Sequence, residues 1–199
     1  MSEKRKIMRI FISLVLVLGF VVPCAGQTNC GKNSDKGILF EVYNVFVAKR
    51  PHDINDINNL LAGSADYNCA EVEEANGLNR QSIFGKPDED IAYVITFSFN
   101  AETAGQWEFA LSYDAGIASA LIIDEKVVMF SDLDIWASYE KPIITAVELK
   151  KGLHNFKFVA LENCCGSPIR LGIKGPSEAD FKVISTTNLA IGHTTAGMP

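Results

Sequence analysis

The chain has 199 residues, of which 48% are hydrophobic, and its formal net charge at pH 7 is −6. This acidic balance excludes nucleic acid and anionic lipid surfaces as partners, because their negative charges repel the chain. The length allows one domain with a sizeable core.

The first 26 residues have the organisation of a secretory signal peptide. Basic residues at positions 4, 5, 6 and 9 precede an apolar run that ends at Val22, and Ala25 and Gly26 offer a cleavage site. We expect removal of residues 1–26 and a mature protein that is secreted, either periplasmic or extracellular. A retained anchor is the alternative, although the uncharged run is short for a span. Lipidation at Cys24 is another alternative, and no later segment is apolar enough to span a membrane.

Beyond residue 26 the chain is predicted to consist mostly of short strands. Large apolar side chains occupy every second position of residues 91–99 and 107–113, the period of a strand with one buried face. A helix is expected after Asp53, a further helical turn or two over residues 69–75, and a loop over residues 79–89. The expected strands cover residues 37–49, 91–99, 106–113, 118–123, 127–130, 143–149, 153–161, 169–173 and 181–184.

Many short strands with regularly spaced turns predict an all-β fold, an antiparallel β-sandwich with one or two short helices. We expect this domain to extend over residues 27–185. Residues 186–199 have little to bury and are expected to form a mobile C-terminal tail.

Four cysteines remain after cleavage, namely Cys30, Cys69, Cys164 and Cys165. An even number in an oxidising compartment predicts two disulfides. Because adjacent residues of an extended chain point to opposite faces, Cys164 and Cys165 are expected to bond to Cys30 and Cys69, with the pairing left open. A strained ring between Cys164 and Cys165 is the alternative. Zinc is not expected, since there is no CxxC pair and the three histidines are scattered.

From about residue 37 to residue 176 the order of features resembles the PA14 β-sandwich family. The core of that family corresponds here to AGQWEFALSYD at residues 104–114 and LIIDEKVV at residues 121–128. A later element corresponds to VELKKGLHNFKF at residues 147–158, and ENCCG follows at residues 162–166. The double cysteine followed by glycine is also similar to the CCXG group of exported bacterial proteins. The resemblance implies a PA14-like sandwich.

The resemblance also implies a calcium site. In the lectin members of the PA14 family, two consecutive aspartates and a later asparagine hold a calcium ion that coordinates sugar hydroxyls. Asp114 matches one aspartate and Asn163 matches the asparagine, whereas Tyr113 replaces the second aspartate. A calcium site on Asp114 and Asn163 is therefore expected to be weakened or lost. Without the ion, Asp114 is a turn residue before Gly116 and Asn163 a loop-capping amide.

Two aromatic residues, Trp136 and Tyr139, lie in a polar segment over residues 131–141 that is expected to be a loop. An aromatic ring on such a loop can stack on the apolar face of a sugar, with hydrogen bonds from Asp132. The alternative is that Trp136 covers the edge of the core. His154 is expected to be exposed to solvent.

These features predict a secreted, non-catalytic binding module. Its ligand is expected to be a carbohydrate or a cell-envelope component, a glycan or an extracellular protein, bound by loops at one end of the sandwich. The alternative is a structural or protein-interaction domain stapled by disulfides, without a small ligand. No motif of an enzyme is present. A Ser–His–Asp triad would require His154 or His52 beside a serine and a carboxylate.

Overall fold

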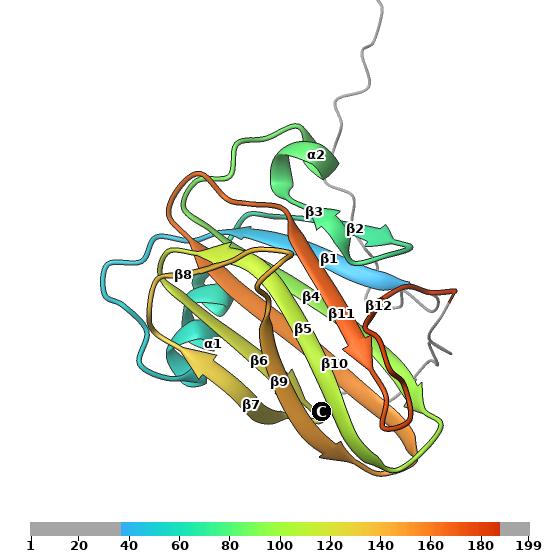
Figure 1. The fold of residues 1–199 in the computed structure, drawn as a ribbon. Helices are drawn as coiled ribbons and strands as arrows, with labels where there is room; N and C mark the ends of the chain where they lie inside the picture. The colour runs from blue at the N-terminus through green and yellow to red at the C-terminus, as the bar shows by residue number, and fades with distance from the viewer. Residues whose placement is uncertain (1–36, 188–199) are drawn as a thin grey trace, which may run out of the picture.

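Two antiparallel β-sheets lie face to face in the computed structural model, which describes residues 37–187 (Figure 1). The predictions of a signal peptide over residues 1–26 and of a role for Cys30 lie outside the described residues. The predicted tail does too, apart from Thr186 and Thr187.

The first sheet has six strands in the order β2-β1-β4-β10-β6-β7, and every neighbouring pair is antiparallel. In that order the strands are Tyr67–Val72, Ile38–Asn44, Ile91–Ala101, Gly152–Glu162, Ala118–Ile123 and Lys126–Ser131. The two long central strands, β4 and β10, hold the sheet together over eleven consecutive residue pairs.

The second sheet has the order β12-β11-β5-β8, with β3 paired to β11 and β9 paired to β5. These strands are Lys182–Val183, Ile169–Lys174, Gly105–Ala115, Ile135–Ala137, Asn76–Leu78 and Ile143–Leu149. All of these pairs are antiparallel as well, so the predicted antiparallel β-sandwich is confirmed.

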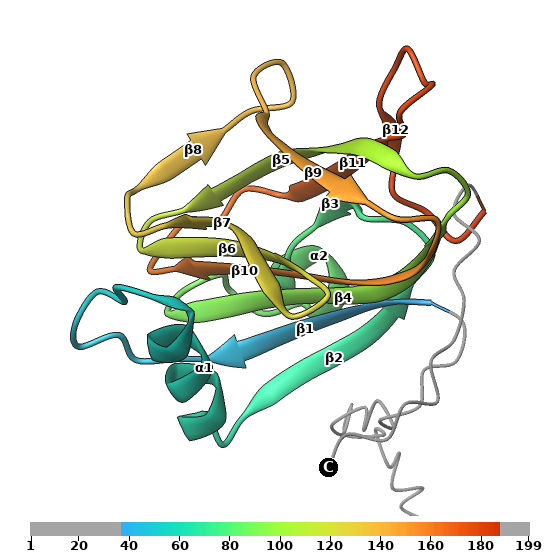
Figure 2. The same cartoon turned by 90° about the horizontal axis from the view of Figure 1, so that it is seen from below.

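The two sheets lie one above the other in Figure 2. The main core between them is rich in aromatic side chains. Phe109 of the second sheet packs on Phe99 and Phe156 of the first, with ring centroids 6.1 and 5.5 Å apart. Each fully buried phenylalanine contributes about 1.5–3 kcal/mol through removal of apolar surface from water. The apolar side chains that recur at every second position of the sequence therefore hold the two sheets together.

A second, smaller core covers the outer face of the first sheet. Helix α1, Ile54–Gly63, begins at Asp53, whose carboxylate accepts the backbone N–H groups of Asn55 and Asp56 at 2.8 and 3.0 Å. Its buried Ile57 packs against the sheet with residues such as Val94, which explains why β4 is buried on both faces. The helix predicted after Asp53 is confirmed.

Three local predictions are wrong. The expected loop over residues 131–141 contains β8. The segment expected to form helical turns contains β2, because Cys69 and its neighbours pair with β1, and tertiary pairing overrides weak local preference. The expected loop over residues 79–89 contains helix α2, Arg80–Phe84, which begins at Asn79. None of the helices among residues 37–187 is long and apolar enough to cross a membrane.

Candidate functional site

The turns that follow β5 and β10 meet at one end of the sandwich. The Ile117 N–H donates to the Leu161 carbonyl at 3.2 Å. A Cβ added at Gly116 would lie 2.5 Å from Asn163 Oδ1 and 3.2 Å from Glu162 Oε1. Gly116 is therefore in direct contact with the Asn163 amide, and a larger residue would displace it.

Arg50, between β1 and α1, joins a third loop to this end. Its guanidinium donates to the carbonyls of Gly116 and Ile117 at 3.2 and 3.0 Å, and also to the carbonyl of Asp132, which follows β7. The loops after β5, β7 and β10 thus converge, as the sequence predicted. Sequence reasoning missed Arg50, because a lone arginine in a loop carries no signal of its distant partners.

Asp114 and Trp136 lie side by side on the outer face of the second sheet. They are register partners of β5 and β8. The preceding Tyr113 is fully buried and its hydroxyl lies 2.8 Å from Ser119 Oγ, so Asp114 points the other way, outward. Trp136 is 80% exposed, which rules out the alternative that it covers the core edge. Asp114 lies within a strand, so the turn expected at this position is wrong.

Two carboxylates of this end have raised pKa values. Partial burial, together with the charge of Asp134, raises the pKa of Asp114. Glu162 is 1% exposed, and burial raises its pKa further than the backbone N–H groups of Asn163 and Cys164, at 2.9 and 3.0 Å from Oε1, can lower it. Its Oε2 has no hydrogen-bond partner within the described residues. This end therefore concentrates negative charge in a partly dehydrated setting.

The residues present do not complete a calcium site. Calcium takes six to eight oxygen ligands, usually including several carboxylates. Tyr113 stands where the second aspartate would be, and its phenol belongs to the core. No cluster of three His, Cys, Asp or Glu that could hold a metal occurs in residues 37–187. Asp114 and Asn163 supply only part of a coordination shell.

The other predicted ligand residues have separate positions. Asp132 contributes its backbone carbonyl, which Arg50 binds. Tyr139 is 47% exposed, and the Arg170 guanidinium lies 5.1 Å from its ring centroid, so one face of the ring is already occupied. Phe46, which the sequence did not single out, is 82% exposed. It borders a shallow hollow of about 280 Å³ lined by Phe46, Val47, Arg50, Asp90, Gly116, Ile117 and Asn163.

Cys164 and Cys165 are both free and exposed in the described structure, which does not contain the disulfides predicted for them. Cys69 is buried on β2 and is disulfide-bonded to a partner outside the described residues. It is level with Glu41, Val94 and Val159 on successive strands. Three strand spacings of about 4.8 Å place it about 14 Å from β10, whereas a disulfide needs Cα atoms within about 7 Å.

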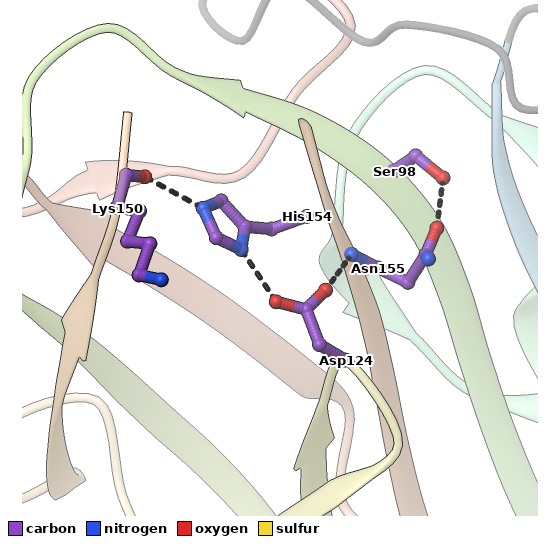
Figure 3. A network of polar contacts seen from close by, with 5 residues as sticks. All are labelled: Ser98, Asp124, Lys150, His154 and Asn155. Atoms are coloured by element: carbon purple, nitrogen blue, oxygen red, sulfur yellow. Dashed lines mark hydrogen bonds and ion pairs between the residues drawn. The ribbon is translucent and has the colours of Figure 1, made fainter. Parts of the chain in front are cut away.

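His154 takes part in a polar network at the β6–β7 turn rather than in a catalytic triad (Figure 3). Its Nδ1 lies 2.6 Å from Asp124 Oδ2 and its Nε2 lies 2.7 Å from the Lys150 carbonyl. Both partners are acceptors, and the imidazolium, which carries a proton on each nitrogen, satisfies both. The nearby Ser98 hydroxyl donates to Asn155 Oδ1 instead, at 2.7 Å. His154 is therefore not available as a general base.

His154 is also buried, contrary to the expected exposure. Burial opposes the charge on its ring, but the Lys150 carbonyl and the Asp124 carboxylate outweigh this effect and raise its pKa. Asp124 additionally accepts the Asn155 N–H at 2.8 Å, which fixes the turn against β10. The network is a structural clamp between a turn and a strand.

Comparison with known proteins establishes the fold. No family model and no curated protein matches the chain. Among solved structures, the PA14 domain of the MpAFP antifreeze protein matches with a TM-score of 0.56 at 11% identity, over 77% of this chain and 89% of that one. The PA14 sugar-binding domain from an RTX adhesin matches with a TM-score of 0.55 at 12% identity, over 80% and 99%.

An anti-sigma factor domain-containing protein from Clostridium clariflavum matches with a TM-score of 0.51 at 15% identity, over 77% of this chain and 46% of that one. At these identities the likeness concerns the fold alone. The chain therefore has a PA14-like β-sandwich fold, as its sequence motifs predicted.

Proposed function

We propose that this protein is a non-catalytic carbohydrate-binding module whose ligand lies across Trp136 and Asp114. The observation that carries this proposal is the exposed indole of Trp136 beside an outward carboxylate on paired strands. Burying such a large apolar side chain would stabilise the fold by about 1.5–3 kcal/mol, so its exposure leaves a surface suited to a ligand. The strand pairing keeps this surface rigid.

The chemistry of the three side chains suits a sugar. The flat indole packs on the C–H face of a pyranose ring and needs little reorganisation to do so. Ring hydroxyls donate to the Asp114 carboxylate, and the Asn163 amide both donates and accepts. Arg50 and Gly116 position the loops that carry these groups without belonging to the ligand surface themselves. The sugar-binding title of the RTX adhesin domain supports the class of ligand.

The proposal includes calcium as an ion that can contribute to glycan binding but is not required for it. Asp114 and Asn163 would be the residues that face the ion, and the ion would supply coordination of sugar hydroxyls. Because the donor set is incomplete, we expect glycan binding to persist in EDTA and to change little in millimolar calcium.

The test is a glycan array with the purified protein, followed by isothermal titration of the best hit with and without calcium. Trp136→Ala should abolish measurable binding, and Trp136→Phe should retain part of it. Phe181→Ala is the matched control, since Phe181 is an exposed aromatic, 38% accessible, on the far β11–β12 segment. Equal binding by wild type and Trp136→Ala would refute the proposed site.

A protein-interaction role without a small ligand is the second candidate. Leu133, 66% exposed, lies close in sequence to Trp136. An aliphatic and an aromatic side chain together are typical of interface anchors, and aliphatic groups add little to sugar recognition. Two results together would favour this role. The protein would bind no glycan on the array, and both Leu133→Ala and Trp136→Ala would lose binding to an extracellular or envelope protein partner.

A further inference from the structure

The adjacent thiols of Cys164 and Cys165 lie at the tip of the β10–β11 loop. Both are free and exposed, and the Cys164 thiol is hydrogen bonded to the Cys165 thiol. The sulfurs are therefore in contact with each other and open to solvent. The third cysteine of the described residues, Cys69, is buried on β2 and already forms a disulfide.

The two ends of this loop are fixed, which keeps the pair in place. On the N-terminal side, Glu162 Oε1 accepts the N–H groups of Asn163 and Cys164. On the C-terminal side, a Cβ added at Gly166 would lie 3.1 Å from the Tyr93 hydroxyl, so the Gly166 backbone packs tightly on that side chain.

Cys165 has a backbone conformation that L-residues rarely adopt. Its φ is 66°, in the left-handed region that favours glycine. A strained residue of this kind persists because the surrounding contacts hold it, and such residues cluster at sites of function. Here the strained backbone belongs to one of the two adjacent cysteines.

We propose that Cys164 and Cys165 form a redox-active dithiol, which a low-molecular-weight disulfide oxidises to a ring disulfide within the loop. This modification site is independent of the proposed sugar site. It needs no other cysteine, which agrees with the distance of more than ten ångströms that separates the pair from β2.

The chemistry proceeds by two exchanges. The hydrogen bond to Cys165, with further contributions from desolvation and from the charges of Glu162 and Asp114, raises the pKa of Cys164 to about 11. Cys164 therefore stays protonated at neutral pH. Cys165 attacks the oxidant and loses its proton, which breaks the S–S bond of the oxidant and releases one thiol. Cys164 then loses its proton and attacks Cys165 Sγ in the mixed disulfide, releasing the second thiol. The protein gives up two electrons and two protons, and the oxidant becomes two thiols.

Trypsin offers a direct test, because cleavage after Lys157 and Arg170 yields one peptide, residues 158–170, that carries both cysteines. The full protein is treated with glutathione disulfide, blocked with iodoacetamide, digested and analysed by mass spectrometry. The expected peptide is unalkylated and two hydrogen atoms lighter than the dithiol form. Dithiothreitol should restore two alkylatable thiols.

The single variants Cys164→Ser and Cys165→Ser provide matched controls. Because both side chains are exposed, the variants should fold, and each should retain one glutathione as a stable mixed disulfide. The proposal is overturned if the wild-type peptide keeps glutathione, remains fully alkylatable, or is cross-linked to the Cys69 peptide or to a second chain.

Discussion

The His154–Asp124 contact predicts a specific dependence of stability on pH. The ordinary pKa of histidine is 6.5, and the Lys150 carbonyl and the Asp124 carboxylate raise it in the folded state despite burial. A folded pKa above the unfolded one means that the folded state holds the proton more tightly. The stabilisation is therefore complete below about pH 6.5 and is lost as the pH rises through the folded pKa.

Asp124→Asn is the substitution that isolates this effect. Asp124 has a φ of 49°, and asparagine tolerates that left-handed conformation as well as aspartate does. The asparagine oxygen can still accept the Asn155 N–H, and an uncharged NH2 group then replaces the carboxylate oxygen that faces His154. Charge-assisted hydrogen bonds contribute about 1.5–3 kcal/mol. Because the Asp124 side chain is 46% exposed, solvent screening lowers the expected loss to about 1 kcal/mol.

The assay is thermal unfolding of both proteins between pH 5.5 and pH 9. For a domain of this size, about 1 kcal/mol corresponds to a midpoint about 3 °C lower at pH 6. This difference should shrink toward zero at high pH, where His154 is neutral in both proteins. Glu125→Gln, at the neighbouring turn position, is the control for charge alone. A wild-type stability that rises from pH 6.5 to pH 9, or a difference independent of pH, would refute the reasoning.

Three further predictions concern the end of the sandwich. Gly116→Ala should weaken ligand binding at least several-fold in a titration, because the added methyl group displaces the Asn163 amide. The control is Gly63→Ala, at a helical position with open space, which should bind the ligand normally and have a slightly higher melting temperature. Arg50→Lys should destabilise by about 1 kcal/mol, because the single nitrogen of an ammonium cannot replace the two separate guanidinium nitrogens that bind these carbonyls. Hydrogen exchange at Gly116 should accelerate. Cys165→Ser should change the unfolding free energy in buffer without reductant by less than about 0.5 kcal/mol, as expected for an exposed free thiol. A loss above about 2 kcal/mol in denaturant unfolding would instead support a long disulfide.

Elements dictated by local pattern could be predicted from the sequence. The two-residue period of β4 reflects one face packed on the opposite sheet, and the N-cap of α1 follows from Asp53 and the apolar spacing behind it. His154 shares the buried face of Phe156 and Phe158, since residues two apart lie on one face, although it was expected on a polar face of the strand. Its polarity suggested exposure, but Asp124 and the Lys150 carbonyl satisfy both of its nitrogens.

The features that distinguish the candidate site depend on strand order, which local patterns do not contain. Cys69 lies on β2 and Cys164 follows β10 of the same sheet, but β1 and β4 lie between these two strands. The residues of neither strand indicate that order. Trp136 lay in a polar segment, and only its pairing with Asp114 makes that segment a strand and directs the indole outward. Among residues 37–187, the strand order that separates Cys69 from β10 leaves Cys164 and Cys165 as each other's available partners. An exposed tryptophan beside a carboxylate and an isolated dithiol therefore share one physical origin, the long-range pairing of the sheets.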